Sequence, residues 1–194
     1  MIYQLKLPKS MESLSNDELY EFCILNKALN IERDANQNII IMAPVGGGSG
    51  FFEKKLGYYI EHWLISNNQG ISFSASTGFL LPNGAMRSPD GCWVSDERWA
   101  KVPDDKKIKF LPVVPDFVVE VRSNTDTLKG TKAKMLEWIE NGVRLAWLID
   151  SKNKQTFIYR ADGTIEKVVG FDKKLSGEEV MKDFEFDLKL LAAY

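Results

Sequence analysis

The sequence predicts a single α/β domain over residues 1–194, in which a mixed β-sheet carries helices 50–66 and 128–141. Three observations support this class. Hydrophobic residues make up 44% of the 194 residues and charged residues 27%, which is typical of a chain that buries one core. Short β-rich runs alternate with stretches whose apolar residues recur at helical spacing. No internal repeat and no long linker divides the chain.

The first half of the chain is expected to form an extended arm, a helix, a hairpin and a second helix. Ser15 and Glu18 make a capping-box pattern at a helix start, and turn-forming residues at 34–38 separate two β-rich runs. The glycine run 46–50 opens a helix whose apolar residues share one face. These elements are expected at residues 1–14, 16–26, 29–33 with 38–42, and 50–66.

The second half contains most of the expected strands and the second core helix. Asn83-Gly84 is a strong hairpin signal, and Gly142 is placed to end a helix. The run 117–121 is apolar except for Glu120, as in a central strand buried on both faces. The expected strands are 71–76, 78–81, 87–94, 115–123, 144–150, 155–160 and 164–169, with helices at 97–100 and 128–141, and a polar tail with apolar residues at 184–190.

Composition restricts the possible chemistry. His62 is the single histidine, so a multi-histidine zinc site is excluded and any histidine-based hydrolase would depend on that residue alone. Cys23 and Cys92 form neither a CxxC pair nor a disulfide framework, so we expect a reducing, cytoplasmic setting. No apolar run approaches the roughly 20 residues of a membrane span, and no membrane partner is expected. Catalysis would fall to carboxylates, lysines or a metal ion held by oxygen.

Three carboxylates stand out. Glu120 lies in the most apolar strand, where it forms either a buried pair with Arg122 or a metal ligand. Asp90 follows Pro89 before a strand and is either a turn residue or a second ligand. Asp116 lies four residues before Glu120, about 13 Å away along a strand, so the two cannot share one ion. We therefore expect Asp116 to cap a loop or a strand entry.

The basic residues and the glycine run allow less specific predictions. Lys132 and Lys134 flank the apolar stripe of helix 128–141 on opposite sides, and helical periodicity does not choose between them. Each can also be a surface lysine. The glycine run 46–50 lacks both the phosphate-loop and the dinucleotide-binding patterns, so it is expected to form a flexible lip.

Four segments, in order, resemble the Uma-type restriction endonuclease family of the PD-(D/E)xK nuclease superfamily. They are IIIMAPVGGGSG, STGFLLPNGAMRSPDGCWVSDERW, PDFVVEVRSNTDTLKGTKAKMLEWIENGVRLAWLID and LSGEEV, and they lie between about residues 29 and 190. The resemblance implies a restriction-endonuclease-like core of helix, three strands, helix and strand (αβββαβ) over about 29–170. The N-terminal helix and hairpin would be additions to this core. It also implies metal-dependent cleavage of DNA.

The resemblance implies roles for particular residues. Asp90 and Glu120 match the two acidic positions that hold Mg²⁺ (or Mn²⁺), and Lys134 matches the lysine that assists the attacking water. Arg122 stands where the superfamily usually has its lysine, so it is expected to contact phosphate or Glu120. Family members tend to carry a glutamate where this chain has Gly48.

The missing glutamate and the charge balance leave further questions open. Glu32 or Glu53 can stand in for the acid absent at residue 48. At a net charge of −2, DNA binding would require a local basic cluster. Its candidate members are Arg122 and Lys132, together with Lys54, Lys55, Arg87, Lys129 and Lys134.

Two classes of function remain open from the sequence. The first is a metal-dependent DNA endonuclease, and the second is a nuclease-like domain that has lost cleavage and serves as a binding or regulatory module; an RNA substrate is also compatible. Cutting both strands of a duplex needs two active sites or two binding events, so a homodimer is expected. Residues 2–7 and 184–191 are its candidate contact elements, unless both pack on their own chain.

Overall fold

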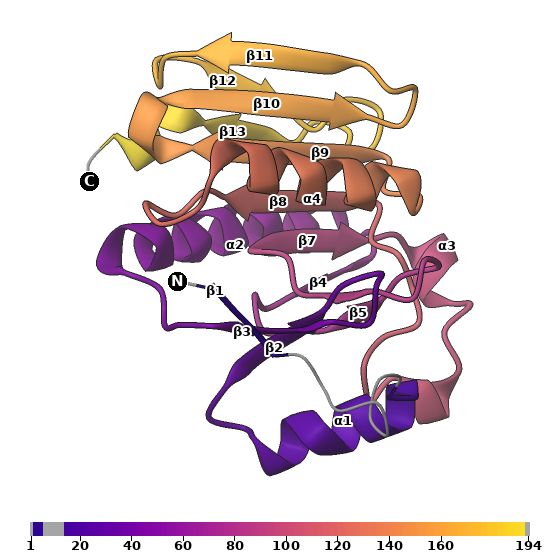
Figure 1. Cartoon of the computed structure of the whole chain (residues 1–194). Coiled ribbons are helices and arrows are strands. Elements are labelled where there is room, and N and C mark those ends of the chain that lie inside the picture. Colours follow the sequence, from indigo (N-terminus) through magenta and orange to yellow (C-terminus); the bar gives the residue numbers. More distant parts are fainter. Residues whose placement is uncertain (1, 6–13, 193–194) are drawn as a thin grey trace.

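A six-stranded mixed sheet forms the centre of the protein in a computed structural model that describes residues 2–5 and 14–192 (Figure 1). Its strands, in spatial order, are β11 (Ile165–Val169), β10 (Gln155–Arg160), β9 (Leu145–Asp150), β8 (Phe117–Val121), β7 (Gly91–Val94) and β4 (Ile71–Phe73). β8 and β9 are parallel, and the other neighbouring pairs are antiparallel. The parallel pair needs a crossover connection, which helix α4 (Leu128–Glu140) provides. The predicted mixed α/β architecture is therefore confirmed.

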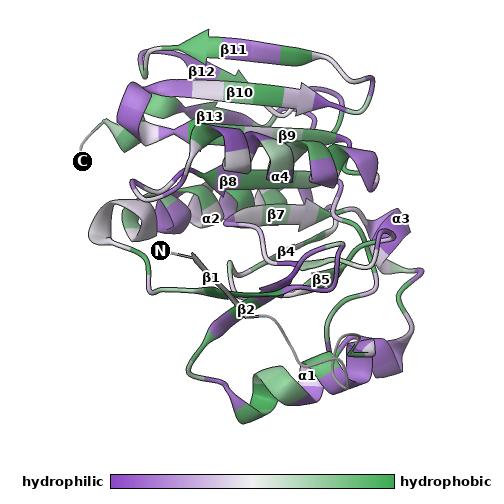
Figure 2. Cartoon of the chain, in the orientation of Figure 1, coloured by the Kyte–Doolittle hydropathy of each residue, from purple (hydrophilic) through white to green (hydrophobic). Residues whose placement is uncertain are grey.

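Helices cover both faces of this sheet. Helix α2 (Gly47–Asn67) packs on the face that carries Phe117 and Val119, whereas α4 packs through Trp138 on the face that carries Val118. The two faces alternate along β8 because successive strand side chains point to opposite sides. Glu120 therefore lies on the α4 face. Figure 2 shows that hydrophobic residues are concentrated in the central strands β8 and β9.

A second sheet lies beside the central one. Its strands, in spatial order, are β1 (Ile2–Leu5), β3 (Ile39–Met42), β2 (Asn30–Arg33), β6 (Met86–Arg87) and β5 (Phe79–Leu80). Helix α1 (Asn16–Leu25) packs on this sheet through the buried Leu19, which contacts Ile31, Ile39 and Met86 in a separate small core. The N-terminal helix and hairpin predicted as additions thus build a second layer of structure.

The predicted helices are confirmed with small changes at their ends. The capping box at α1 forms, since the Ser15 hydroxyl accepts from the Glu18 N–H and the Glu18 carboxylate accepts from the Ser15 N–H. Helix α2 begins at Gly47 rather than at residue 50, with Gly46 as its N-cap. A short helix α3 (Asp96–Trp99) follows β7, close to the predicted position. Gly142 follows α4 with a φ of 107°, the left-handed geometry that favours glycine.

The predicted strand 87–94 is wrong in an informative way. It is two strands, β6 and β7, that belong to different sheets. Pro89 has no N–H to give to a ladder, and the Ser88 N–H donates to the carboxylate of Glu32 rather than to a strand neighbour. Residues 88–90 therefore link the two sheets, and Asp90 lies at the end of that link.

The C-terminal tail is also more ordered than predicted. It forms β12 (Lys174–Ser176), β13 (Glu185–Asp187) and the short helix η4 (Leu188–Leu191). Phe184 and Phe186 are buried in the core on the α2 face of the central sheet. The buried side chains of residues 184–191 pack on their own chain, which is the alternative that the sequence left open, and a dimer contact through the exposed residues stays a prediction. In the predicted arm, β1 pairs with β3, and residues 6–13 lie outside the described residues.

Two further observations concern the setting of the protein. Over residues 2–5 and 14–192, no helix combines the length and the hydrophobicity needed to cross a membrane. Cys23 and Cys92 are both free thiols, and Cys92 is buried.

Candidate active site

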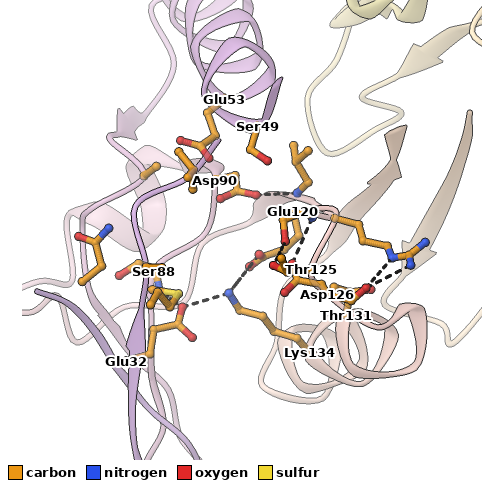
Figure 3. Close-up of a pocket in the computed structure, with 18 of the residues that line it drawn as sticks. Glu32, Ser49, Glu53, Ser88, Asp90, Glu120, Thr125, Asp126, Thr131 and Lys134 are labelled. Carbon is orange, nitrogen blue, oxygen red and sulfur yellow. Dashed lines mark hydrogen bonds and ion pairs between the residues drawn. The ribbon is translucent and has the colours of Figure 1, made fainter. Parts of the chain in front are cut away.

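A pocket of about 1570 Å³ opens where the two sheets meet the N-terminal ends of α2 and α4. It is larger than the roughly 300–1,000 Å³ usual for small-molecule sites, so it has room for part of a macromolecule. Four carboxylates and one lysine that the sequence singled out line it together (Figure 3). They are Glu32, Glu53, Asp90, Glu120 and Lys134.

Strand register brings Asp90 and Glu120 together. Gly91, the first residue of β7, pairs with Val119 of β8, so Asp90 directly precedes this pair and Glu120 directly follows it. Both side chains line the pocket, and the charge of Glu120 acts on Asp90. The carboxylate of Asp90 also accepts a hydrogen bond of 2.6 Å from the backbone N–H of Val121. The two carboxylates are therefore neighbours in the pocket, and that they share one ion stays a prediction.

Glu120 is a buried carboxylate with two side-chain partners. Lys134 Nζ lies 2.9 Å from its Oε1 and 3.0 Å from its Oε2, and the indole N–H of Trp138 donates to Oε1 at 2.9 Å. The alternative pair with Arg122 does not form. Arg122 instead binds Asp150 at 3.0 Å and donates to the backbone carbonyl of Asp126.

The surroundings raise the pKa values of Asp90, Glu120 and Lys134. Burial raises the pKa of Glu120, and burial together with the charge of Glu120 raises the pKa of Asp90 well above its usual value. Burial alone would lower the pKa of Lys134, but the charges of Glu120 and Glu32 outweigh it and the net shift is upward. Lys134 is therefore an ammonium at neutral pH. The two acids form a repelling pair that an added cation would stabilise.

Glu32 anchors a second group of ion pairs in the pocket. Its carboxylate lies 3.0 Å from Lys134 Nζ and 3.0 Å from Arg87 Nη1, and it accepts a 2.9 Å hydrogen bond from the Ser88 N–H. Burial would raise the pKa of Glu32, but the charges of Lys134 and Arg87 reverse the shift. Arg87 also binds Glu137 of α4 at 2.6 Å. These contacts connect the second sheet to α4.

Glu53 is the other candidate for the missing acid. It extends from α2 toward Asp90 (Figure 3), it is half-buried, and burial raises its pKa. Within the described residues Glu53 makes no hydrogen bond or ion pair, so its carboxylate is open to the pocket. Over the same residues, no group of three or more His, Cys, Asp or Glu side chains has the spacing to hold a metal ion.

The predicted basic cluster is only partly assembled. Arg122 lines the pocket with its guanidinium already bound, whereas Lys132 does not line it and lies 3.9 Å from the centre of the Phe157 ring. Three lysines that we did not select from the sequence lie exposed on the pocket rim and make no ion pair within the described residues. They are Lys27, Lys152 and Lys154.

One signal could have identified two of these lysines. Lys152 and Lys154 follow β9, which is parallel to β8, and the carboxyl ends of parallel strands meet at one edge of a sheet.

Asp116 behaves as expected, since it is buried, accepts from the Ser95 N–H at 2.8 Å and binds Arg98 at 3.2 Å.

A mixed sheet between two helices, with two facing carboxylates and a lysine at one end of its central strands, defines a restriction-endonuclease-like α/β protein. The chain belongs to the Uma2 family, described as "Putative restriction endonuclease", which it matches over residues 17–190. The family resemblance seen in the sequence is confirmed.

Comparison with solved structures supports the fold. A protein from Anabaena variabilis ATCC 29413, described as "a putative nuclease belonging to DUF820", superimposes with a TM-score of 0.71 at 16% sequence identity. The match covers 84% of this chain and 89% of the other. No curated protein matches the chain.

Proposed function

We propose that this protein is a Mg²⁺-dependent endonuclease that hydrolyses phosphodiester bonds of DNA. Asp90 and Glu120 would hold the ion, and Lys134 would assist the attacking water. The observation that supports this proposal is that Asp90 and Glu120 adjoin the paired residues Gly91 and Val119 in one pocket, where Lys134 binds Glu120. Membership of the Uma2 family supports the same chemistry.

The donor set fits a hard divalent cation. Mg²⁺ prefers oxygen ligands and is usually held by one or two carboxylates together with water and substrate phosphate. Asp90 and Glu120 supply two such carboxylates, and burial is the main reason that the pKa values of both are raised, with the charge of Glu120 adding to the shift of Asp90. When bound, a divalent ion (Mg²⁺ or Mn²⁺) supplies Lewis-acid polarisation of the phosphate and a more acidic water.

Lys134 can act on the phosphate as a fixed positive charge. An ammonium has three N–H donors, of which one reaches Glu32 and one is shared by the two oxygens of Glu120. The remaining donor can contact the attacking water or a phosphate oxygen and so offset the negative charge that develops there. Arg122 cannot take this role, because its guanidinium is held by Asp150 and by the backbone of Asp126.

The proposed DNA contacts surround the acidic pair. The rim lysines Lys27, Lys152 and Lys154 are exposed in the pocket and carry charge that phosphates would neutralise. Arg122 and Lys132, our contacts from the sequence, stay predictions. With a net charge of −2, affinity should come from this local cluster.

A catalytically inactive binding module is the second candidate. One observation favours it: Lys134 already neutralises Glu120, and Gly48 brings no carboxylate to the pocket. In that case the pocket would bind nucleic acid without cutting it.

The predictions of a homodimer and of a reducing, cytoplasmic compartment belong to the proposal as well. A dimer would give the two active sites that a double-strand break needs, and the free thiols Cys23 and Cys92 agree with a reducing setting. Light scattering that finds a monomer at tens of micromolar would remove the dimer from the proposal.

Nicking of supercoiled plasmid by the purified protein tests the proposed function. We expect cleavage with Mg²⁺ or Mn²⁺, none with EDTA, and none by Glu120→Ala. Asp116→Asn is the matched control, since it changes a buried carboxylate away from the pocket and should keep cleavage. A wild-type protein that binds but never cuts DNA would favour the inactive module, and cleavage of an RNA oligonucleotide alone would change the substrate.

A further inference from the structure

Glu32 is a pocket residue to which the proposed mechanism gives no role. It lies on β2, outside the central sheet, and is 2% exposed. Every neighbour that satisfies it is a donor from another element: Lys134 of α4, Arg87 of β6 and the Ser88 N–H. A buried carboxylate is costly to keep unless such donors compensate it, so its position is closely determined.

Two of these donors belong to the proposed active site. The same Oε1 atom accepts from Lys134 Nζ at 3.0 Å and from the Ser88 N–H at 2.9 Å. Ser88 begins the link 88–90 that ends at Asp90. Glu32 therefore contacts both the lysine and the backbone that carries one of the acidic residues (Figure 3).

Lys134 depends on Glu32 for a second anchor. In the structure it is shared between Glu32 at 3.0 Å and Glu120 at 2.9 Å. If Glu120 held a divalent cation, the negative charge of Glu120 would be shared between that cation and the ammonium of Lys134. Glu32 is then the carboxylate whose hold on Lys134 is unaffected, because its other partners are the fixed donors Arg87 and Ser88.

We propose that Glu32 is a positioning residue, which holds Lys134 and residues 88–90 in place for the reaction; this inference rests on the proposed function. A purely structural role would be shared by Glu137. That residue binds the same Arg87, at 2.6 Å, but makes no hydrogen bond to Lys134 or to residues 88–90. The two glutamates therefore form a matched pair for an experiment.

The first test compares Glu32→Gln with Glu137→Gln in plasmid nicking with Mg²⁺. Each variant removes one negative charge from the surroundings of Arg87 and keeps the length of the side chain. We expect Glu32→Gln to lower kcat by about 10–100-fold, the usual effect of losing a residue that orients a reacting group. KM should change by less than about threefold, because substrate contacts remain. Glu137→Gln should keep kcat near that of the wild type. Equal values of kcat in the two variants would overturn the inference.

A second variant protects the test against loss of folding. Glu32→Asp keeps the charge for Arg87 but shortens the side chain, so it cannot reach both Lys134 and the Ser88 N–H. We expect it to keep a thermal midpoint near that of the wild type and to lower kcat as well. A wild-type kcat in Glu32→Asp would overturn the inference.

Crystal structures of the metal-free wild type, Glu32→Gln and Glu137→Gln give a readout without activity. We expect Lys134 Nζ to leave its place between residues 32 and 120 only in Glu32→Gln. An unmoved Lys134 and unmoved residues 88–90 in that variant would overturn the inference. If Lys134 moves but the wild type never nicks DNA, the positioning role stands and the proposed function fails.

Discussion

Replacing Asp90 by Asn should stabilise the protein in the absence of metal and remove its response to divalent ions. Asp90 lies beside Glu120 in the pocket, and burial and this neighbouring charge raise the pKa of Asp90 well above its usual value. An asparagine keeps an oxygen that can accept from the Val121 N–H. It removes the negative charge, so the repulsion disappears while the hydrogen bond can remain.

The size of the effect follows from the separation of the two side chains. Two like charges about 5 Å apart repel by roughly 3 kcal/mol at an effective dielectric constant of about 20. Lys134 offsets part of this repulsion, and proton uptake limits the rest. We therefore expect the free energy of unfolding to rise by about 1–2 kcal/mol, or roughly 2–8 °C in the thermal midpoint of a protein of this size.

The pH dependence has a definite sign. The pKa of Asp90 is raised in the folded protein, so its ionisation opposes folding. The gain from Asp90→Asn should be absent below the unfolded pKa of about 3.9, appear as the pH rises above it, and become full above the folded pKa. Thermal unfolding in EDTA at about pH 4 and about pH 8 measures this difference.

The response to metal supplies the second half of the test. A divalent ion at about ten times its dissociation constant should stabilise the wild type by about 1.4 kcal/mol, or roughly 3–6 °C. Asp90→Asn should lose this rise. The control Asp116→Asn should be less stable than the wild type, because it weakens the pair with Arg98, and should keep the rise with metal. A lower midpoint for Asp90→Asn in EDTA at about pH 8, or a retained metal response, would refute the reasoning.

Three further predictions concern lysines and thiols. Lys134→Met should reduce kcat by at least about 100-fold, while the DNA affinity, measured by fluorescence anisotropy in Ca²⁺, changes little. Cleavage at the wild-type rate in this variant would mean that Lys134 has no part in catalysis. Lys152→Met should reduce the slope of log affinity for DNA against log salt concentration by about one unit, and an unchanged slope would exclude Lys152 from the DNA interface. The same salt titration of Lys132→Met tests whether Lys132 contacts DNA. Because burial raises the pKa of Cys23 to about 11 and that of Cys92 to about 12, neither should react with a thiol reagent at neutral pH, and rapid labelling of either would contradict this assignment.

The parts of the site that were predictable from the sequence depend on local patterns. Asp90 follows Pro89 before a strand and Glu120 interrupts an apolar strand, and the family resemblance matches both to the two acidic positions of the site. Lys134 is in a helix whose apolar stripe was readable, but the stripe left Lys132 and Lys134 equivalent. Only the packing of Trp138 against the sheet shows that Lys134 faces the pocket and that Lys132 faces Phe157.

The parts that were not predictable depend on contacts between distant segments. The break between β6 and β7 is fixed by the Ser88 N–H bonding to Glu32, a residue of the preceding hairpin. Burial of Phe184 and Phe186 depends on the face of the sheet that α2 leaves open. Neither contact can be predicted from the residues of its own segment. The residues around Ser88 would also fit a longer strand, and those around Phe184 would also fit an exposed tail.

The charge balance of the pocket itself argues for a cation. Its floor combines four carboxylates with two cations: Glu32, Asp90, Glu120 and Glu137 against Arg87 and Lys134. Buried ion pairs add little to stability compared with well-packed apolar residues, and unpaired buried charge lowers it. Arg87 pairs with Glu32 and Glu137, and Lys134 is shared by Glu32 and Glu120, so the four carboxylates together exceed the two cations by two charges. Within the described residues Asp90 has no ion pair, and its charge is repelled by that of Glu120. Folding alone gives no reason to keep two repelling carboxylates opposite each other, whereas a divalent cation would neutralise both at once. The cost that Asp90→Asn should remove is thus the same charge that we propose the protein uses to bind its metal ion.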